Sequence, residues 1–205
     1  EVSVGIIGTA GYVMPKVLAS YQREHPGIQL DLMMGNRNTI WDAILDGNID
    51  IGIMGTPPED TNIQSEVIGI HRLIFVAHPN HPLCQLDREL TPKELIKHQL
   101  IAREVGSGTR LAMAAYFGAL FHQATRPPIV LDTNEGIKQS ILAGMGISLL
   151  SDATCELELN HGLLKTLPVE GTPLDRQWYA VRLANLERNP AEQSLLRFLV
   201  MQAER

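Results

Sequence analysis

The sequence contains one pattern twice, and 98 positions separate Thr9 from Ser107 and Asn36 from Asn134. Each copy begins with an apolar, β-branched run and continues through a glycine and a hydroxyl residue into a helical stretch. A second apolar strand follows and ends beside an asparagine. A period this long lies outside the roughly 20–50 residues of solenoid repeats. The repeat therefore predicts two similar α/β lobes.

Strand and helix patterns alternate within each copy. We expect strands at Val2–Gly8, Ile28–Met34 and Ile49–Met54 in the first copy, and at Leu100–Glu104, Ile129–Asp132 and Ile147–Leu150 in the second. Two adjacent strands, Ser65–Ile70 and Leu73–Ala77, are expected between the copies; a strand at Gln177–Leu183 and an amphipathic helix at Pro190–Ala203 close the chain. This order is typical of doubly wound α/β structure with right-handed crossovers.

The chain is expected to cross between the lobes twice, near residues 70–75 and near residues 172–178. Two crossings predict a two-strand hinge. We expect subdomain I to comprise residues 1–72 and 178–205, and subdomain II to comprise residues 73–177. Open α/β sheets bind ligands at the carboxyl ends of their strands. The prediction is a small-molecule site in a cleft between the lobes.

Composition narrows the class of protein. The 205 residues are 44% hydrophobic and carry a net charge of −6. Nucleic-acid surfaces need a basic footprint, so we expect no DNA contact from this stretch. No apolar run approaches the roughly 20 residues that span a bilayer. Cys84 and Cys155 have no CxxC partner, which favours two unpaired thiols in a reducing cytoplasm.

The strongest sign of a binding site is the run Arg103–Arg110. Its glycines, including Gly108, let a ligand approach the backbone. Ser107 and Thr109 place hydroxyls at a helix start, where free N–H groups and the helix dipole favour anions. Arg103 and Arg110 add forked donors for carboxylate or phosphate. Taken alone, the run could be an ordinary helix cap with a glycine turn.

The first copy has a matching run, Gly8–Gly11, which strengthens the interpretation as an anion site. Asn36 and Asn134 end equivalent strands, and each could either point into the cleft or cap a helix. Gly55 and Thr56 end the third strand and could supply backbone contacts, or simply form a turn before two prolines. Lys138 lies one turn into the helix after Asn134 and could reach the cleft, but we expect it on a solvated helix face.

No set of residues demands catalysis. His78 and His81 are three positions apart in a proline-rich loop, without cysteine or carboxylate at ligand spacing. Ser107 lacks a GxSxG context and ordered His and Asp partners. We therefore expect no catalytic residues, no metal and no cofactor, and a protein that is not an enzyme.

The chain resembles the effector-binding domain of LysR-type bacterial transcriptional regulators over essentially its whole length. The opening strand with Thr9 and Met14-Pro15 carries this resemblance, together with the segments HPGIQLDLMMGN, AILDGNIDIGIMG, HPNHPL, NEGIKQSILAGMGISLL and NPAEQSLLRFL. Within that family, GNRN, REVGSGTR and TNEGIKQ look like the regulators of Calvin-cycle operons, which control RuBisCO genes.

The resemblance implies two subdomains of the type 2 periplasmic-binding-protein fold, with an inducer between them. It implies a cytoplasmic homodimer or homotetramer that contacts no membrane. DNA would be bound only by an amino-terminal winged helix-turn-helix, which is missing from these residues. Pocket residues carried over by position are Thr9, Ala10, Asn36, Gly55, Thr56, Ser107, Gly108, Thr109 and Asn134.

Carbon-fixation regulators respond to anionic metabolites, such as ribulose bisphosphate, phosphoglycolate, phosphoenolpyruvate or NADPH, and the sequence does not choose between them. Two alternatives belong to other classes. One is a periplasmic solute-binding protein of the same fold, which a signal peptide upstream of Glu1 would favour. The other is an enzyme on this fold, which no residue set supports.

Overall fold

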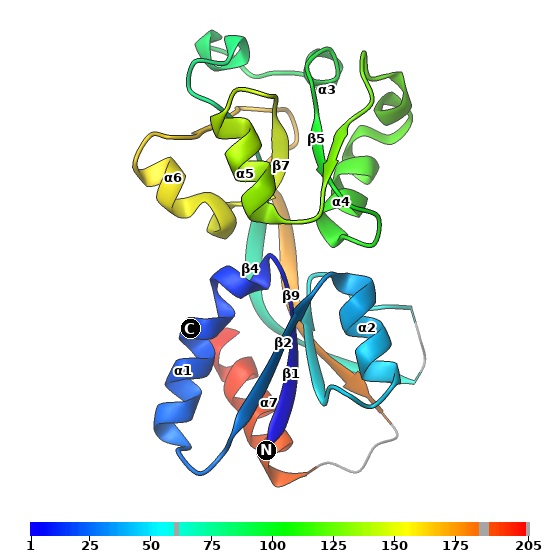
Figure 1. Cartoon of the computed structure of the whole chain (residues 1–205), viewed down its shortest axis with the longest axis vertical. Coiled ribbons are helices and arrows are strands. Elements are labelled where there is room, and N and C mark those ends of the chain that lie inside the picture. Colours follow the sequence, from blue (N-terminus) through cyan, green and yellow to red (C-terminus); the bar gives the residue numbers. More distant parts are fainter. Residues whose placement is uncertain (60–61, 185–188, 204–205) are drawn as a thin grey trace. The chain divides into compact units, whose positions relative to one another are not determined.

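The computed structural model describes residues 1–59, 62–184 and 189–203. It divides into two compact units (Figure 1). Unit 1 comprises Glu1–His71 and Arg176–Arg205, and unit 2 comprises Arg72–Asp175. Two long strands, β4 (Ile63–Ala77) and β9 (Leu174–Leu183), each contribute residues to both units.

Unit 1 is built on a sheet whose strands follow the order β2-β1-β3-β9-β4. Its first three strands are β1 (Val2–Ile7), β2 (Leu30–Gly35) and β3 (Ile51–Met54). They are parallel, and β9 joins β3 in the antiparallel sense. The helices are α1 (Met14–Glu24), α2 (Arg37–Leu45) and α7 (Pro190–Ala203). The central strand β1 is almost wholly buried, as its continuous apolar sequence predicts.

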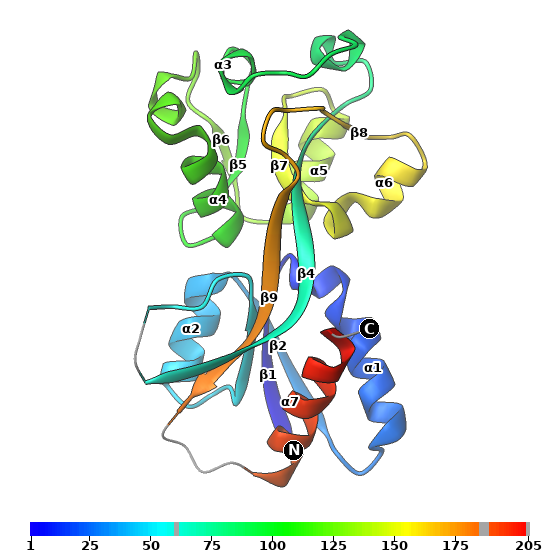
Figure 2. The ribbon, with the colours of Figure 1, turned by 180° about the vertical axis from the view of Figure 1, so that it is seen from behind.

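Alternation along β1 gives each face of the sheet its own packing partner. Glycines on one face let α2 pack closely, because a Cβ on Gly5 would lie 2.9 Å from Ile40 and one on Gly52 would lie 2.5 Å from Ile44. Helices α1 and α7 lie side by side (Figure 2), and the Tyr21 hydroxyl donates to the Ala191 carbonyl at 3.3 Å. One hydrophobic core joins these elements.

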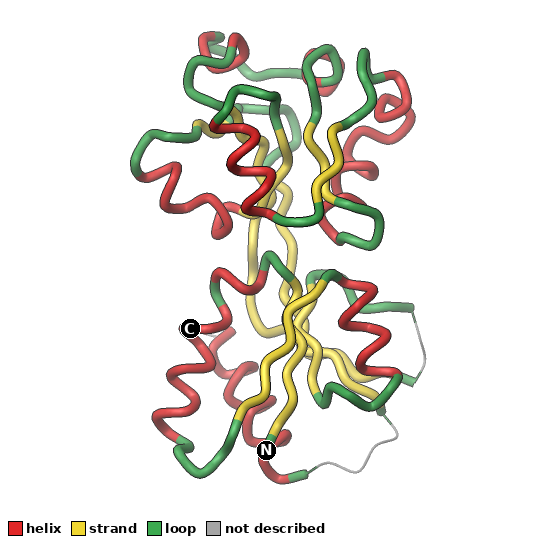
Figure 3. The backbone as a smooth tube through the Cα atoms, viewed as in Figure 1, coloured by secondary structure: helices red, strands yellow, loops and turns green. Residues whose placement is uncertain are grey.

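Unit 2 repeats the plan with shorter strands (Figure 3). Strands β5 (Ile101–Arg103) and β6 (Ile129–Leu131) are parallel, while β7 (Ser148–Ser151) and β8 (Lys165–Thr166) pair antiparallel with β4. The helices are α3 (Pro92–Leu95), α4 (Gly108–Phe117), α5 (Asn134–Leu142) and α6 (Glu156–Asn160). The described residues of the two units also include four 3₁₀ helices: Ala10–Tyr12, Pro82–Gln85, Gly118–Gln123 and Asp152–Cys155.

The predicted repeat is visible in the strand pairing. The third strand of each copy pairs antiparallel with one of the two long strands, β3 with β9 and β7 with β4. In unit 2 the first and third strands meet through a parallel bridge between Leu100 and Ile147. A Cβ on Gly146 would lie 2.3 Å from the Gln99 carbonyl oxygen, so this approach requires glycine.

Several predicted elements are confirmed and one is wrong. The final helix spans Pro190–Ala203 as expected, whereas the predicted pair Ser65–Ile70 and Leu73–Ala77 is a single strand of 15 residues. His71 and Arg72 separate the two apolar runs in the sequence. Strand β4 nevertheless continues through them without a turn and pairs with both β9 and β7. Strand β2 begins at Leu30 and β3 at Ile51, each two residues later than predicted. No helix in the described residues is long and apolar enough to cross a membrane.

Candidate functional site

The predicted binding residues of unit 1 lie at one edge of its sheet. Thr9 and Ala10 follow β1, Asn36 follows β2, and Gly55 and Thr56 follow β3. These three strands are adjacent and parallel, so their carboxyl ends share an edge. The backbone closes this edge further, since the Gly8 N–H donates to the Gly35 carbonyl at 3.1 Å.

Thr9 is positioned to cap the helix that follows β1, as hydroxyl residues often do, but its side chain makes no capping bond. Its backbone already has helical angles, φ −72° and ψ −36°, and it precedes the short 3₁₀ helix at Ala10. A capping residue needs an extended backbone to turn its side chain toward the first free N–H groups. The residue is 5% exposed, and its hydroxyl meets no partner among the described residues. The Thr9 hydroxyl is therefore available to a ligand.

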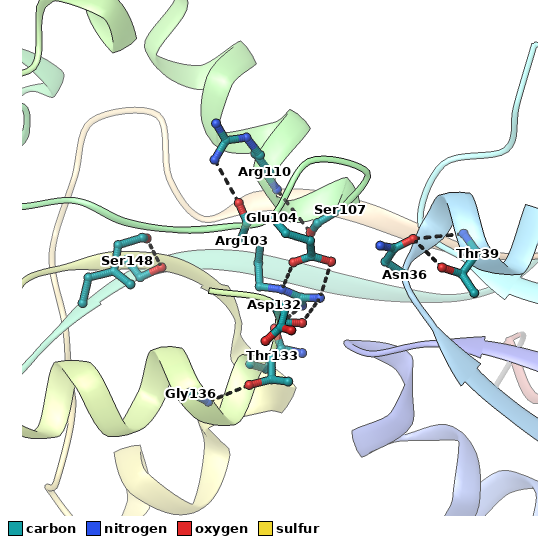
Figure 4. A network of polar contacts seen from close by, with 12 residues as sticks. Asn36, Thr39, Arg103, Glu104, Ser107, Arg110, Asp132, Thr133, Gly136 and Ser148 are labelled. Atoms are coloured by element: carbon teal, nitrogen blue, oxygen red, sulfur yellow. Dashed lines mark hydrogen bonds and ion pairs between the residues drawn. The ribbon is translucent and has the colours of Figure 1, made fainter. Parts of the chain in front are cut away.

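Asn36 is the N-cap of α2. Its Oδ1 accepts hydrogen bonds from the Thr39 backbone N–H at 3.0 Å and from the Thr39 hydroxyl at 3.1 Å (Figure 4). The capping alternative is thus confirmed for this asparagine. A capping Oδ1 leaves the amide N–H₂ as the group that could still donate to a ligand.

Arg37 lies at this edge as well, although the sequence analysis did not single it out. Its Nε donates to the Thr56 carbonyl at 3.0 Å, which links the start of α2 to the turn after β3. The motif GNRN contains this residue. Its contact with Thr56 joins positions 19 residues apart in the sequence, so local pattern could not predict it.

An aromatic stack supports the other side of the same turn. The rings of His71 and Trp178 are parallel within 14°, with centroids 3.8 Å apart, and both side chains are buried. A Cβ added to Gly55 would lie 3.4 Å from His71 Nε2, an ordinary van der Waals contact. The stack therefore forms the packed support beneath Gly55 and Thr56.

The predicted residues of unit 2 surround the start of α4. Ser107 is the N-cap, with φ −81° and ψ 133°, and its hydroxyl accepts from the Arg110 N–H at 3.5 Å. Gly106 precedes it with φ +95°, a conformation that favours glycine. Thr109 is 7% exposed, and its hydroxyl has no partner among the described residues. Free N–H groups and one free hydroxyl thus share a helix start.

Arg103 is the centre of a buried network (Figure 4). Its guanidinium holds the Glu104 carboxylate with two bonds, Nε–Oε2 at 2.8 Å and Nη2–Oε1 at 3.1 Å. Nη1 donates to Asn134 Oδ1 at 2.6 Å, and Nη2 also donates to the Asp132 carbonyl at 3.1 Å. This pairing compensates the charge of Arg103. Within unit 2, its geometry is that of a residue that positions Asn134.

Arg110 is oriented differently. Its Nη1 donates to the Arg103 carbonyl at 2.9 Å, and no carboxylate among the described residues pairs with it. Its charge therefore remains uncompensated by local ion pairs, one turn from the α4 N-cap. A ligand anion near Thr109 would experience that charge.

Asn134 is not a helix cap, so that alternative is wrong for this position. Thr133 is the N-cap of α5, and its hydroxyl accepts from the Gly136 N–H at 3.0 Å. Asn134 begins the helix itself and is 5% exposed. The repeat thus shifts by one residue between the copies: Asn36 caps α2, but the residue before Asn134 caps α5.

Lys138 is buried, which contradicts the predicted solvated face. Its Nζ lies 2.7 Å from Glu158 Oε1 and 3.0 Å from Glu135 Oε2. The hydrogen bond from Gln139, followed by Lys138, lowers the pKa of Glu135. Glu158 comes from α6, so only the tertiary structure could reveal that the helix face is covered.

Both cysteines are unpaired, as predicted, and the structure shows that both are buried. Burial, followed by the charges of Glu158 and Asp152, raises the pKa of the Cys155 thiol to about 12. A protonated, buried thiol is unreactive. Among the described residues, no group of three His, Cys, Asp or Glu could hold a metal ion. His78 and His81 instead accept from the backbone N–H groups of Asn80 and Leu83 through Nδ1.

The chemistry available at these two sheet edges is hydrogen-bond donation. In unit 1 the Thr9 hydroxyl, the Asn36 amide and Arg37 lie at the strand ends, and in unit 2 the Thr109 hydroxyl, the first N–H groups of α4 and Arg110 do. Groups of these kinds suit small anions. The fold and these edges define a small-molecule-binding α/β protein with the type 2 periplasmic-binding-protein architecture.

The particular family follows from comparison with known proteins. Residues 1–204 match the family described as "LysR substrate binding domain", and the chain belongs to this family. It is 41% identical to the HTH-type transcriptional regulator CbbR of Xanthobacter flavus over 201 residues, 97% of this chain and 60% of that protein. It is 39% identical to CfxR of Cupriavidus necator over 201 residues, 98% of this chain and 62% of that protein. The chain thus spans about three-fifths of each relative.

A solved structure is also similar. The CcmR regulatory domain of Synechocystis, in complex with 2-PG, is 30% identical, with a TM-score of 0.88 and coverage of 99% of this chain and 97% of that one. The effector-binding domain of QuiR, 20% identical with a TM-score of 0.85, shares the fold over 99% of this chain and 96% of that one. The predicted family and fold are confirmed.

Proposed function

We propose that this chain is the metabolite-sensing part of a transcriptional regulator of carbon-fixation genes. The observation that carries the proposal is the likeness to CbbR and CfxR along nearly the whole chain, joined to the likeness to CcmR with 2-PG. Control of genes would require a DNA-binding segment outside these residues. The chain itself acts by binding, without catalysis, in the cytoplasm.

The effector is a small phosphorylated acid, with 2-phosphoglycolate the first candidate because of the CcmR complex. It binds the unpartnered hydroxyls of Thr9 and Thr109, the free N–H groups of α4, Asn36, and the turn at Gly55 and Thr56. Arg103 holds Asn134 in place for it. Ser107 and Gly108 leave the backbone open, and Arg110 supplies charge.

Effector binding acts on the arrangement of the two units. A ligand that contacts both of them favours one arrangement by its differential affinity for the two states. Strands β4 and β9 carry that change, because both run through the boundaries at His71 and Asp175. Small-angle scattering with and without effector tests this step, and an unchanged profile at saturation contradicts it.

Oligomers form through exposed apolar surface. Strand β2 ends the sheet order and exposes Leu32 and Met34, which are 47% and 53% accessible. Unpaired apolar edges are sites of association. A homodimer or homotetramer would cover them. A secreted solute-binding role is not favoured, because the similar proteins named above are transcriptional regulators.

Calorimetric titration tests the effector site. Ribulose bisphosphate, 2-phosphoglycolate, phosphoenolpyruvate and NADPH are titrated into the chain and into its Thr109→Ala variant. A hydrogen bond to a charged group contributes about 1.5–3 kcal/mol, so loss of the Thr109 hydroxyl should weaken the true effector roughly 10- to 150-fold. Unchanged affinity for every compound would remove Thr109 from the site.

A gel-shift titration tests whether DNA binding requires a segment outside these residues. The 205-residue chain carries a net charge of −6 and should not bind an operator specifically. The whole regulator should bind the operator as an oligomer. Tight, sequence-specific binding by the chain alone would contradict this part of the proposal.

A further inference from the structure

Charge is distributed unevenly among the residues proposed to bind the effector. Those of unit 1 are all uncharged: Thr9, Ala10, Asn36, Gly55 and Thr56. A phosphate monoester carries a charge of about −1.5 to −2 near pH 7. Neutral donors alone compensate little of that charge, so we expect a positively charged side chain near the phosphate.

Arg110 of unit 2 supplies one positive charge, since no carboxylate among the described residues pairs with it. Arg103 does not supply a second. Its two bonds to Glu104 and its bonds to Asn134 and the Asp132 carbonyl occupy all three nitrogens of its guanidinium. A buried cation that is paired with a carboxylate and already uses four of its five N–H donors has little capacity for a further anion. Arg103 therefore acts through the residues that it positions.

Arg37 has the opposite environment. One bond, from Nε to the Thr56 carbonyl at 3.0 Å, fixes its guanidinium beside the turn after β3. Its other donors, on Nη1 and Nη2, meet no acceptor among the described residues, and no carboxylate pairs with it there. The two terminal nitrogens of a guanidinium held in this way form a fork that matches two phosphate oxygens.

The second copy of the repeat carries the opposite charge at the position that corresponds to Arg37. Glu135 lies 98 residues after Arg37 and is its counterpart in the repeat. It is the second residue of α5, whereas Arg37 is the first residue of α2. Its carboxylate pairs with Lys138 at 3.0 Å. The first copy thus has an unpaired cation where the second has a paired anion, a difference that the shared topology does not require.

We propose that Arg37 is a specificity-determining residue that binds the phosphate group of the effector and selects phosphorylated acids. This assignment rests on the proposed function, because it requires a phosphorylated effector at the edge formed by Asn36, Gly55 and Thr56. The Nε bond to Thr56 orients the guanidinium, and Nη1 and Nη2 donate to the phosphate. Arg37 thereby supplies the charge that the other unit 1 residues lack.

The test is calorimetric titration of 2-phosphoglycolate into the wild-type chain and the Arg37→Gln, Arg37→Lys and Arg23→Gln variants. Arg23 is the matched control: it lies at the far end of α1, and its Nη2 donates only to Ser20 Oγ at 2.8 Å. We expect Arg37→Gln to raise the Kd roughly 10- to 150-fold, the range of a lost charged hydrogen bond. Arg37→Lys should keep part of the affinity, and Arg23→Gln should change the Kd less than about twofold.

A spectroscopic readout separates binding from support of the turn. Phosphorus NMR follows the second ionisation of the phosphate, near pH 6 for a free monoester, at saturating ligand. An adjacent guanidinium lowers the pKa of that phosphate, so the bound phosphate should titrate at higher pH in Arg37→Gln than in wild type. If affinity falls but the phosphate titrates identically, Arg37 only holds Thr56, and the proposal is overturned.

The remaining outcomes are also decisive. Binding by wild type with an unchanged Kd in Arg37→Gln overturns the role of Arg37 alone. Failure of the wild-type chain to bind any phosphorylated acid overturns the proposed effector class, and the role of Arg37 with it. Should Arg37→Gln fail to fold, Arg37→Met takes its place: a raised Kd together with a bound phosphate that titrates at higher pH than in wild type supports the charge contact, and an unchanged phosphate titration contradicts it.

Discussion

The two units place opposite chemistry at corresponding positions. Gly5 in β1 and Arg103 in β5 are 98 residues apart, as are Ile40 in α2 and Lys138 in α5. In unit 1 the glycine lets the isoleucine pack directly on the strand. In unit 2 both positions carry buried cations, which are paired with Glu104 and with Glu158. One topology thus accepts either an apolar or an ionic layer between strand and helix.

The difference shows what each layer contributes. Apolar packing is non-directional, so contact between Ile40 and β1 stabilises unit 1 without orienting any polar group. Buried ion pairs require defined geometry, and removing only one partner strongly lowers the free energy of unfolding. In unit 2 the buried guanidinium of Arg103 orients Asn134, at the edge where we place the effector.

The largest expected effect comes from making unit 2 resemble unit 1. Lys138→Met leaves the largely buried Glu158 carboxylate, whose side chain is 14% exposed, without its cation; its Oε2 is inaccessible and already lacks a partner among the described residues. We expect the free energy of unfolding, measured with urea, to fall by about 3–5 kcal/mol. The exposed Lys16 provides the control, since Lys16→Met should change it by less than about 0.5 kcal/mol.

The double variant Lys138→Met/Glu158→Leu sharpens the same comparison. Replacing both partners of a buried pair by apolar residues is often neutral. Most of the lost stability should therefore return. A single variant that loses under about 1 kcal/mol would show that the ionic layer is no more demanding than the apolar one.

A smaller loss of stability should distinguish the turn at Ser107, after β5, from the turn at Thr9, after β1. Ser107 caps α4 with its side chain, whereas Thr9 makes no capping bond. Ser107→Ala should lower the free energy of unfolding by about 0.5–1 kcal/mol, toward the low end for caps because its bond is long, 3.5 Å. Thr9→Ala should lower it by less, as followed by thermal unfolding. Equal losses would mean that the turns are equivalent after all.

The smallest expected effect is a pH dependence confined to unit 2. Burial, and then the nearby His98, lowers the pKa of His81; burial, and then Lys97, lowers the pKa of His98. The neutral forms are therefore favoured in the folded state. Stability is complete above the unfolded value of 6.5 and declines as pH falls through the lowered folded values.

Urea midpoints at pH 7.5 and pH 5.5 measure this decline. The variant His81→Gln/His98→Gln should lose less stability between these two pH values than wild type. The window lies above the range in which the lowered pKa of Glu135 matters, because that carboxylate is ionised throughout it. An identical decline in the variant would assign the pH dependence to other groups.

The sequence predicted those elements of the fold that residues close together in the chain determine. The buried strand β1, the N-cap at Asn36 and the helix Pro190–Ala203 all follow from apolar spacing and cap chemistry within a few residues. The continuous strand β4 did not follow, since it pairs with β7, 72–78 residues further along the chain, and with β9, which begins 97 residues after β4 ends. The candidate edges followed from the repeat, which aligns residues at strand ends.

What the sequence alone determined is the repeat, the α/β class, the family and the residues that end each parallel strand. Spacing carries this information, because a strand end and a helix start are local events. Only the tertiary structure decided which charges are satisfied. Arg103 and Lys138 become paired because Glu104 and Glu158 share their buried surroundings, while Arg37 contacts only a carbonyl. A charge is compensated or available according to its neighbours in space, and contacts between distant segments determine those neighbours.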